Sequence, residues 1–301
     1  MALKSTCSAI AALFMCATIT TSCAKPAPTT SSLPGRPGLW KLADADTTIY
    51  LFGTIHVLPK GYQWRTKAFD KAAAAADTLV LEVADLGDTA KTAEIFGKLA
   101  VSPGLPPVLD RVPPDKRAGL QKMIDKSGFP AAALGQFESW AVAITLAGGM
   151  LTDLKLSPED GVERILTAQF ASAKKNVIGL ETTALQLGFF DTLPETAQRS
   201  FLASIVDDKA DPATEFTQML TAWSQGDDGA IALTFDDELR LSPELTEALL
   251  RRRNASWTAW LTQRLKTPGT ILVAVGAGHL AGAESVQALL AKQGFKVTRV
   301  Q

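Results

Sequence analysis

The hydrophobic residues of this chain fall in short runs near both ends, and turn-forming residues bound each run. Such runs are typical of strands. Residues 40–42 and 48–52 are expected to pair antiparallel across a turn at residues 44–46. Residues 78–83 form a continuous apolar run that carries one acid, Glu82, which indicates a central strand buried on both faces. Further strands are predicted at residues 176–180, 270–275 and 295–299.

Helical patterns separate these strands. Shorter helices are predicted at residues 69–77, 158–172 and 279–293, and longer helical stretches at residues 89–150 and 195–264, the latter with caps at Asp211, Asp227 and Ser242. Strands and helices that alternate at both ends around a helical middle predict an α/β fold. We expect a mixed central sheet flanked by helices, with the middle helices forming a cap over one edge, in a single domain of residues 39–301.

The first residues are typical of an export signal, predicted at residues 1–24. Lys4 precedes an apolar stretch, residues 9–19, that is too short to cross a bilayer. Two forms of processing stay open: plain cleavage, or a lipobox in which Cys23 becomes the lipidated first residue. Residues 25–38 are rich in proline and small polar residues and are predicted to be a disordered tether. We therefore expect an exported protein, periplasmic or lipid-anchored, that meets the membrane only through its signal or anchor.

The net charge and the positions of the cysteines exclude several kinds of partner and site. The net charge is −1 and no basic face is evident, so nucleic acid is not an expected partner. All three cysteines (Cys7, Cys16, Cys23) lie in or at the edge of the export signal. The predicted mature domain therefore has no disulfide, thiolate nucleophile or cysteine-based metal site.

Two similar motifs place a histidine directly after a strand. Gly53–His56 follows the predicted strand at residues 48–52, and Gly276–His279 follows the strand at residues 270–275. Ligand sites of open α/β sheets lie at the carboxyl ends of the strands. The chain has only these two histidines, so their shared context favours one joint site over two separate core histidines. That inference requires the two strands to be neighbours in the sheet.

Acidic residues complete a candidate metal site. Imidazole and carboxylate groups together hold divalent ions such as Mn, Co or Zn, so His56, Glu82 and His279 are the predicted ligands. Glu82 has an equal alternative as half of an internal salt bridge with an arginine. Glu181 ends the strand at residues 176–180 and is either a second carboxylate of the site or a helix cap.

An arginine–asparagine pair and four tryptophans are also relevant to the site. Residues 251–253 are most simply a solvated helix face, but Arg253, beside Asn254, is a candidate to turn inward and stabilise an oxyanion or a carboxylate. Four tryptophans are most simply core residues: Trp140, Trp223, Trp257 and Trp260.

These residues resemble the TraB/GumN family. The matching segments, in the family's order, are residues 39–42, 50–59, 81–83, 177–182 with Gln186, Arg253–Asn254 and residues 275–280. The resemblance implies a likeness to the Tiki metalloproteases and, more distantly, to the erythromycin-esterase and ChaN-like groups. It assigns His56 and His279 to the two motif histidines and Glu82 to the family's acid. Many members carry Gly-x-Asp where this chain has Gly161-Val162-Glu163, so Glu163 is a departure from the family pattern.

Three functions follow, in order of preference. The first is a metal-dependent hydrolase acting on peptide bonds, with Glu82 or Glu181 as general base and Arg253 beside the developing charge. The second is a metal-free, esterase-like hydrolase in which His56 is the general base, oriented by Glu82. The third is a non-catalytic protein that binds haem, metal or a peptide. A peptide or a small molecule is the expected partner in each case.

Overall fold

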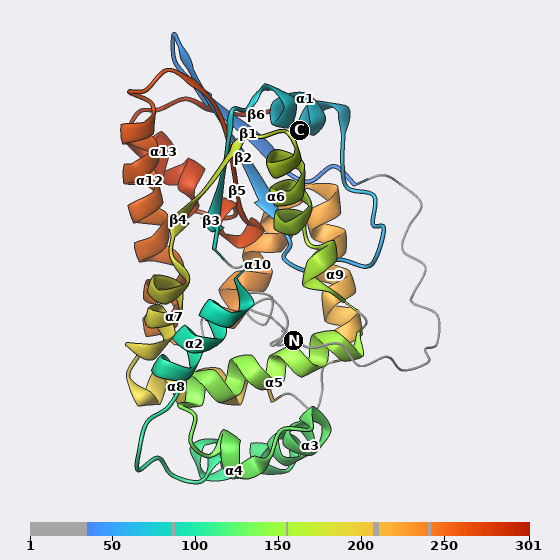
Figure 1. The fold of residues 1–301 in the computed structure, drawn as a ribbon, viewed down its shortest axis with the longest axis vertical. Coiled ribbons are helices and arrows are strands. Elements are labelled where there is room, and N and C mark those ends of the chain that lie inside the picture. The colour runs from blue at the N-terminus through green and yellow to red at the C-terminus, as the bar shows by residue number, and fades with distance from the viewer. Residues whose placement is uncertain (1–34, 86–87, 155, 207–210, 240–241) are drawn as a thin grey trace.

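A six-stranded sheet forms the centre of the protein, with strand order β4-β3-β5-β2-β1-β6. The computed structural model describes residues 35–85, 88–154, 156–206, 211–239 and 242–301 (Figure 1). The strands are β1 (Leu39–Ala43), β2 (Thr47–Thr54), β3 (Thr78–Val83), β4 (Asn176–Glu181), β5 (Gly269–Gly276) and β6 (Val297–Arg299). The mixed α/β architecture predicted from the sequence is confirmed.

The four strands β4, β3, β5 and β2 are mutually parallel, whereas β1 and β6 are antiparallel to their neighbours in the pairs β1–β2 and β1–β6. The predicted hairpin and the central place of β3 are both confirmed. Strands β2 and β5 pair in register up to their last residues, Thr54 opposite Gly276. Both Gly-x-x-His motifs therefore leave the sheet at the same edge, as the joint-site inference required.

Helices cover both faces of the sheet and build a separate helical end (Figure 1). Their bounds are α1 (Lys67–Ala75), α2 (Thr89–Leu99), α3 (Arg117–Ser127), α4 (Ala131–Leu134), α5 (Ser139–Asp153), α6 (Val162–Ser172), α7 (Thr183–Asp191), α8 (Glu195–Ser204), α9 (Pro212–Gln225), α10 (Asp228–Leu239), α11 (Pro243–Thr246), α12 (Arg252–Arg264) and α13 (Val286–Lys292). Helices α1, α6 and α9 pack on one face of the sheet, and α12 and α13 pack on the other. Helices α3, α5 and α8 enclose a core of their own beyond the carboxyl ends of the strands.

The helix predicted over residues 279–293 is wrong at its start. A short 3-10 turn, Ala277–Leu280, follows β5, and α13 begins only at Val286. Gly282 lies between this turn and α13 and has a φ of +77°, a conformation that favours glycine. The Ser285 side chain then caps α13. The loop after the first motif is longer still, because α1 begins at Lys67. His56 and His279 therefore both stand on irregular backbone between the sheet and the next helix.

The amino-terminal segment contacts the domain earlier than its composition indicates. In the stretch predicted as a tether, Gly35 N–H donates to the carbonyl of Gln63, and the Pro37 carbonyl accepts from the Gln301 side chain. The predicted export signal, the lipobox at Cys23 and most of the tether lie outside the described residues. Within the described ranges, no helix combines the length and hydrophobicity needed to span a bilayer.

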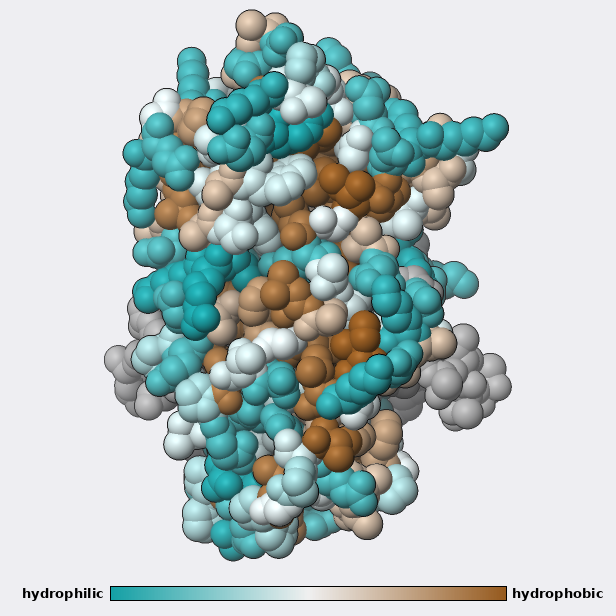
Figure 2. All heavy atoms as spheres, turned by 60° about the vertical axis from the view of Figure 1, so that its left-hand side comes forward, coloured by the Kyte–Doolittle hydropathy of each residue, from teal (hydrophilic) through white to brown (hydrophobic). Residues whose placement is uncertain are grey.

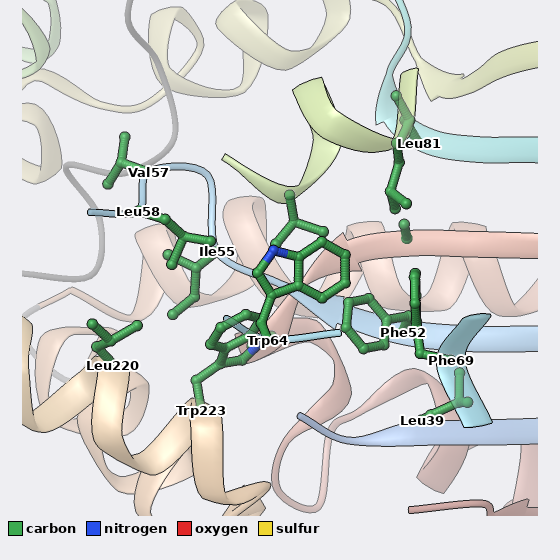
Figure 3. Close-up of a cluster of buried hydrophobic side chains, with 14 of the residues drawn as sticks. Leu39, Phe52, Ile55, Val57, Leu58, Trp64, Phe69, Leu81, Leu220 and Trp223 are labelled. Atoms are coloured by element: carbon green, nitrogen blue, oxygen red, sulfur yellow. The ribbon is translucent and has the colours of Figure 1, made fainter. Parts of the chain in front are cut away.

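A cluster of buried aromatic rings fixes the end of β2 (Figure 3). The Phe52 ring lies 4.4 Å from that of Phe69 and 5.5 Å from that of Trp64, measured between centroids. The Trp223 indole N–H donates to the Gly53 carbonyl at 2.8 Å, so α9 is tied directly to the first motif. Burying several aromatic side chains together is a large stabilising contribution, and here it immobilises the strand end from which His56 projects.

Gly161 allows α6 to begin against the loop that carries His56. The Val162 N–H donates to the Ile55 carbonyl at 3.2 Å. A Cβ added to Gly161 would stand 2.0 Å from the His56 carbonyl oxygen, which is far inside contact distance. This close approach brings Glu163, one residue into α6, to the edge of the sheet.

We expect Gly161→Ala to lower the free energy of unfolding by about 1–3 kcal/mol, because the new methyl group forces the loop and α6 apart. Gly97→Ala is the matched control, since nothing lies within 4 Å of the added Cβ in the last turn of α2. That control should be neutral or stabilising by up to about 1 kcal/mol. Urea denaturation of the two variants measures both values, and equal stabilities would contradict the steric argument.

Candidate functional site

Four parallel strands deliver polar residues to one point at the sheet edge. A Cβ added to Gly276, at the end of β5, would lie 3.1 Å from Glu82 Oε1 and 3.5 Å from His56 Nε2. The His279 ring carbon Cδ2 would lie 3.7 Å from the same position. We call this meeting point of the three side chains the Gly276 junction. It shows that His56 and His279, 223 residues apart in the chain (279 − 56), do share one site.

The Arg253 guanidinium joins the acids of the site. It is 1% exposed and lies in the first turn of α12. Its Nη2 donates to Glu82 Oε2 at 2.6 Å and to Glu181 Oε2 at 2.9 Å, and its Nε donates to Glu181 Oε1 at 2.9 Å. Its Nη1 donates to His279 Nε2 at 3.0 Å and to the Leu249 carbonyl at 3.2 Å. All five N–H groups of the guanidinium are therefore used within the protein.

The backbone before α12 explains how Arg253 points inward. Residues Glu247–Arg251 form a π-helical turn, in which the usual i to i−4 bonding is shifted by one residue. This turn leaves the Leu249 carbonyl within reach of the Arg253 side chain. Arg251 and Arg252 remain exposed, so only one of the three consecutive arginines turns into the protein, as the sequence had made Arg253 a candidate to do.

Glu82 is held as a carboxylate. Its Oε1 accepts from the Gly276 N–H at 2.7 Å, and its Oε2 accepts from Gln186 at 3.0 Å as well as from Arg253. Burial by itself raises the pKa of Glu82, but the nearby Arg253 cation and the two histidines outweigh it and hold the pKa well below its ordinary value. The salt bridge that was the alternative reading of Glu82 is thus present in the structure.

Glu181 is enclosed by donors. The Trp257 indole N–H donates to its Oε1 at 2.9 Å, beside the two contacts from Arg253. Burial raises the pKa of Glu181, and the Arg253 cation opposes that rise. Glu181 does not cap the following helix, because the Thr182 hydroxyl accepts from the Leu185 N–H at the start of α7.

His279 is neutral and fixed in one tautomer by its partners. Its Nε2 accepts from Arg253, so its Nδ1 carries the proton and donates to Asn254 Oδ1 at 2.6 Å. Burial and the adjacent Arg253 cation lower the pKa of His279 to about 3. The Trp257 ring lies 4.4 Å away between centroids and covers the imidazole. The imidazole therefore acts as a hydrogen-bond acceptor for a buried cation.

His56 has the opposite electrostatic setting. Its Nδ1 lies 2.8 Å from Glu163 Oε1, and the Thr54 hydroxyl also donates to that carboxylate. Burial lowers the pKa of His56, but the Glu163 charge and its hydrogen bond overcome burial and raise the pKa to about 9. The side chain is 24% exposed, and no described residue hydrogen-bonds its Nε2, which faces the Gly276 junction.

All the predicted site residues meet at this edge: His56, Glu82, Glu181, Arg253, Asn254 and His279. The sequence reasoning did not foresee the part played by three others. Gln186 bridges the two acids, Trp257 contacts both Glu181 and His279, and Glu163 pairs with His56. The sequence offered a signal for Gln186, which accompanies a family-like segment, and for Glu163, which marks a departure from the family pattern.

The residue types at this edge suit a divalent ion, but their arrangement does not. The lone pair of His279 Nε2 is directed at Arg253, and the ring presents carbon Cδ2 to the junction where His56 and Glu82 meet. Among the described residues, no group of three or more His, Cys, Asp or Glu side chains is placed to hold a metal ion. A metal with all three predicted ligands would need Arg253 to release His279.

We expect the His56 ring to titrate near pH 9 and the His279 ring to stay neutral down to about pH 3. Glu163→Gln should lower the His56 midpoint, because it removes the anion that favours the imidazolium. With only two histidines in the chain, NMR of the ring nitrogens follows both titrations without ambiguity. A His56 midpoint unchanged by Glu163→Gln would show that the ion pair does not set it.

The ion pair of Glu163 with His56 makes the free energy of unfolding depend on pH. The folded pKa of His56, about 9, exceeds its ordinary value of 6.5, so the pair stabilises the fold fully below about pH 6.5 and loses this contribution as pH rises through about 9. The difference in free energy of unfolding between wild type and Glu163→Gln should therefore shrink over that interval. Glu163→Asp, which keeps the charge, is the control and should retain the pH dependence. A difference that stays constant across the interval would contradict the linkage.

One of three comparisons with known proteins finds a match. A model of the TraB/PrgY/gumN family matches residues 38–299, which is most of the chain and includes both histidine motifs. No curated protein and no solved structure matches the chain. The likeness to the erythromycin-esterase and ChaN-like groups thus stays a prediction. The family match covers both of the motifs whose histidines meet in the structure. The chain belongs to the TraB/PrgY/gumN family.

Proposed function

We propose that this protein is a hydrolase in which His56 is the general base that activates water. One observation carries the proposal: His56 Nδ1 is held by Glu163, while Nε2 faces the Gly276 junction beside Glu82 Oε1. A base whose far nitrogen is fixed by a carboxylate keeps one tautomer and one orientation, as general-base catalysis requires. The orienting carboxylate in this proposal is Glu163, whereas the sequence had suggested Glu82.

Apart from Glu82, the other polar residues position the site without touching the reacting atoms. Arg253 has no N–H left to stabilise an oxyanion, so its role is to hold Glu82 and Glu181 in place. Asn254 and His279 extend that network, and Gln186 links the two acids. Among the described residues, Glu82 Oε1 accepts a hydrogen bond from the Gly276 N–H alone, and it lies on the side of His56, where it would orient a water molecule.

Peptides and esters are the substrate classes that we propose. Hydrophobic side chains gather in a band down the middle of the face that includes the left-hand side of Figure 1, between polar margins (Figure 2). Exposed large hydrophobic residues include Ile178 of β4 and Leu185 of α7, the two elements that flank Glu181. Exposed apolar surface next to a polar site favours a ligand that carries apolar groups.

The divalent ion predicted from the sequence is the alternative to this metal-free proposal. It is supported by the residue types around the Gly276 junction and opposed by the bond between Arg253 and His279. Chelation separates the two: hydrolysis that depends on His56 alone should survive EDTA, and hydrolysis that depends on the ion should not.

We expect His56→Ala to reduce hydrolysis by about 10²–10⁴-fold, the range typical of lost general-base catalysis. Only about one His56 ring in a hundred is neutral at pH 7 when the pKa is about 9, so the wild-type rate should rise with pH until about pH 9. The assay uses labelled casein and p-nitrophenyl butyrate, each with and without EDTA.

The matched control is Gln169→Ala, a change at a half-buried position of the helix that carries Glu163, where the side chain accepts a hydrogen bond from Arg65. It should leave the rate unchanged. Three results would overturn the proposal: an active His56→Ala variant, a rate abolished by EDTA and restored by Mn, Co or Zn, or a rate that is flat below pH 9 and falls above it. The last result would make the protonated ring a general acid.

A further inference from the structure

The Arg253 guanidinium is the cation that offsets the negative charge of two buried carboxylates around it. Glu82 and Glu181 supply two carboxylates, His279 is neutral, and the Arg253 guanidinium is the positive group that contacts all three. The side chains of Arg253, Glu82 and Glu181 are 1%, 7% and 4% exposed. Bulk water therefore cannot replace the guanidinium as the partner of these anions.

The contacts of Arg253 are of the kinds a divalent ion would take. The guanidinium receives oxygen from two carboxylates, a lone pair from an imidazole nitrogen and a backbone carbonyl oxygen from Leu249. Carboxylate oxygen and neutral imidazole are the usual ligands of Zn, Mn and Co. Asn254, which accepts from His279 Nδ1, also has the place of the outer partner that orients a metal-bound histidine.

Two aromatic rings and a backbone carbonyl also contact the guanidinium. Arg253 lies 4.8 Å from the centroid of the Trp257 ring and 5.8 Å from that of Phe189, both within the range of cation–π attraction. The Leu249 carbonyl in the π-helical turn adds a hydrogen bond from its own chain segment. Every side of this cation thus has a built partner, which favours a permanent occupant over a side chain that makes way for an ion.

We propose that Arg253 is the resident cation of the site, and that it excludes a divalent ion from the ligands Glu82, Glu181 and His279. Removing the side chain turns the cluster into a divalent-cation site with two carboxylates and one imidazole. The proposal concerns the identity of the cation and does not depend on whether His56 catalyses hydrolysis.

The test is metal binding by Arg253→Ala, measured by titration calorimetry with Zn²⁺ and by the absorption spectrum with Co²⁺. The expected result is one bound ion per chain, with an affinity about a hundredfold or more above that of the wild type, because one unit of positive charge has left the buried cluster. Arg252→Ala is the matched control, since the Arg252 side chain is 66% exposed and pairs with Glu247 on the surface. It should bind metal no better than the wild type.

Guanidinium ion provides a second readout. At millimolar, non-denaturing concentrations it should re-enter the space left by Arg253→Ala and lower the affinity for Zn²⁺ in proportion to its concentration. His279→Ala combined with Arg253→Ala should lose the added affinity. Binding by Arg253→Ala that ignores both guanidinium and His279 would place the ion elsewhere and overturn the proposal.

If Arg253→Ala fails to fold, a measurement on the wild-type protein still tests the proposal. Zn²⁺ added to the wild-type protein should leave the ¹⁵N signal of His279 Nε2 in place, because Arg253 occupies that acceptor nitrogen. A change of the Nε2 signal to that of a metal-bound nitrogen at stoichiometric Zn²⁺ would show that a divalent ion binds His279 with Arg253 in place, and the proposal would fail. Hydrolysis assays do not enter either test, so a failure here is distinct from a failure of the proposed general base.

Discussion

The ion pairs of Arg253 with Glu82 and Glu181 are the constraint on which this edge of the sheet depends. A carboxylate enclosed at the end of a buried strand is costly unless a cation and hydrogen bonds compensate it. Here two such carboxylates end adjacent strands, and one guanidinium from α12 serves both. Helix α12 is therefore bound to the sheet by charge as well as by the apolar contacts of Trp257 and Leu261. Removing Arg253 would leave both carboxylates buried without their cation.

The parallel register explains why so few residues suffice to build the site. Strands β2, β5, β3 and β4 run in one direction, so their carboxyl ends meet at one edge and present His56, His279, Glu82 and Glu181 there. The junction forms around Gly276 because the absence of a side chain lets Glu82 and His56 approach the backbone. A side chain at that point would press against the Glu82 carboxylate, so glycine suits the packing whatever chemistry the neighbouring groups perform.

Much of this arrangement could be predicted from the sequence, because apolar runs and turn residues determine strands locally. The interrupted apolar run at residues 78–83 correctly indicated a central strand, and the repeated Gly-x-x-His pattern correctly indicated neighbouring strand ends. What could not be predicted depends on tertiary contacts. Whether Glu82 meets a metal or an arginine is decided by the rotation of α12, which a π-helical turn sets, and no local pattern shows that turn. The pairing of Glu163 with His56 likewise depends on the close approach of α6 at Gly161.

The two histidines share a sequence motif but differ in protonation state and in role. Both follow a parallel strand and a glycine, yet the pKa of His56 is about 9 and that of His279 is about 3. The difference arises from the partner of each ring: the anion Glu163 favours the charged form of His56, and the cation Arg253 together with burial favours the neutral form of His279. His279 is neutral and both of its ring nitrogens are engaged, so it belongs with the framework. His56 is partly exposed, and no described residue hydrogen-bonds its Nε2, so it is the histidine able to exchange a proton with a ligand. The motif therefore fixes where each imidazole stands, and the neighbours brought in by α6 and α12 fix what it can do.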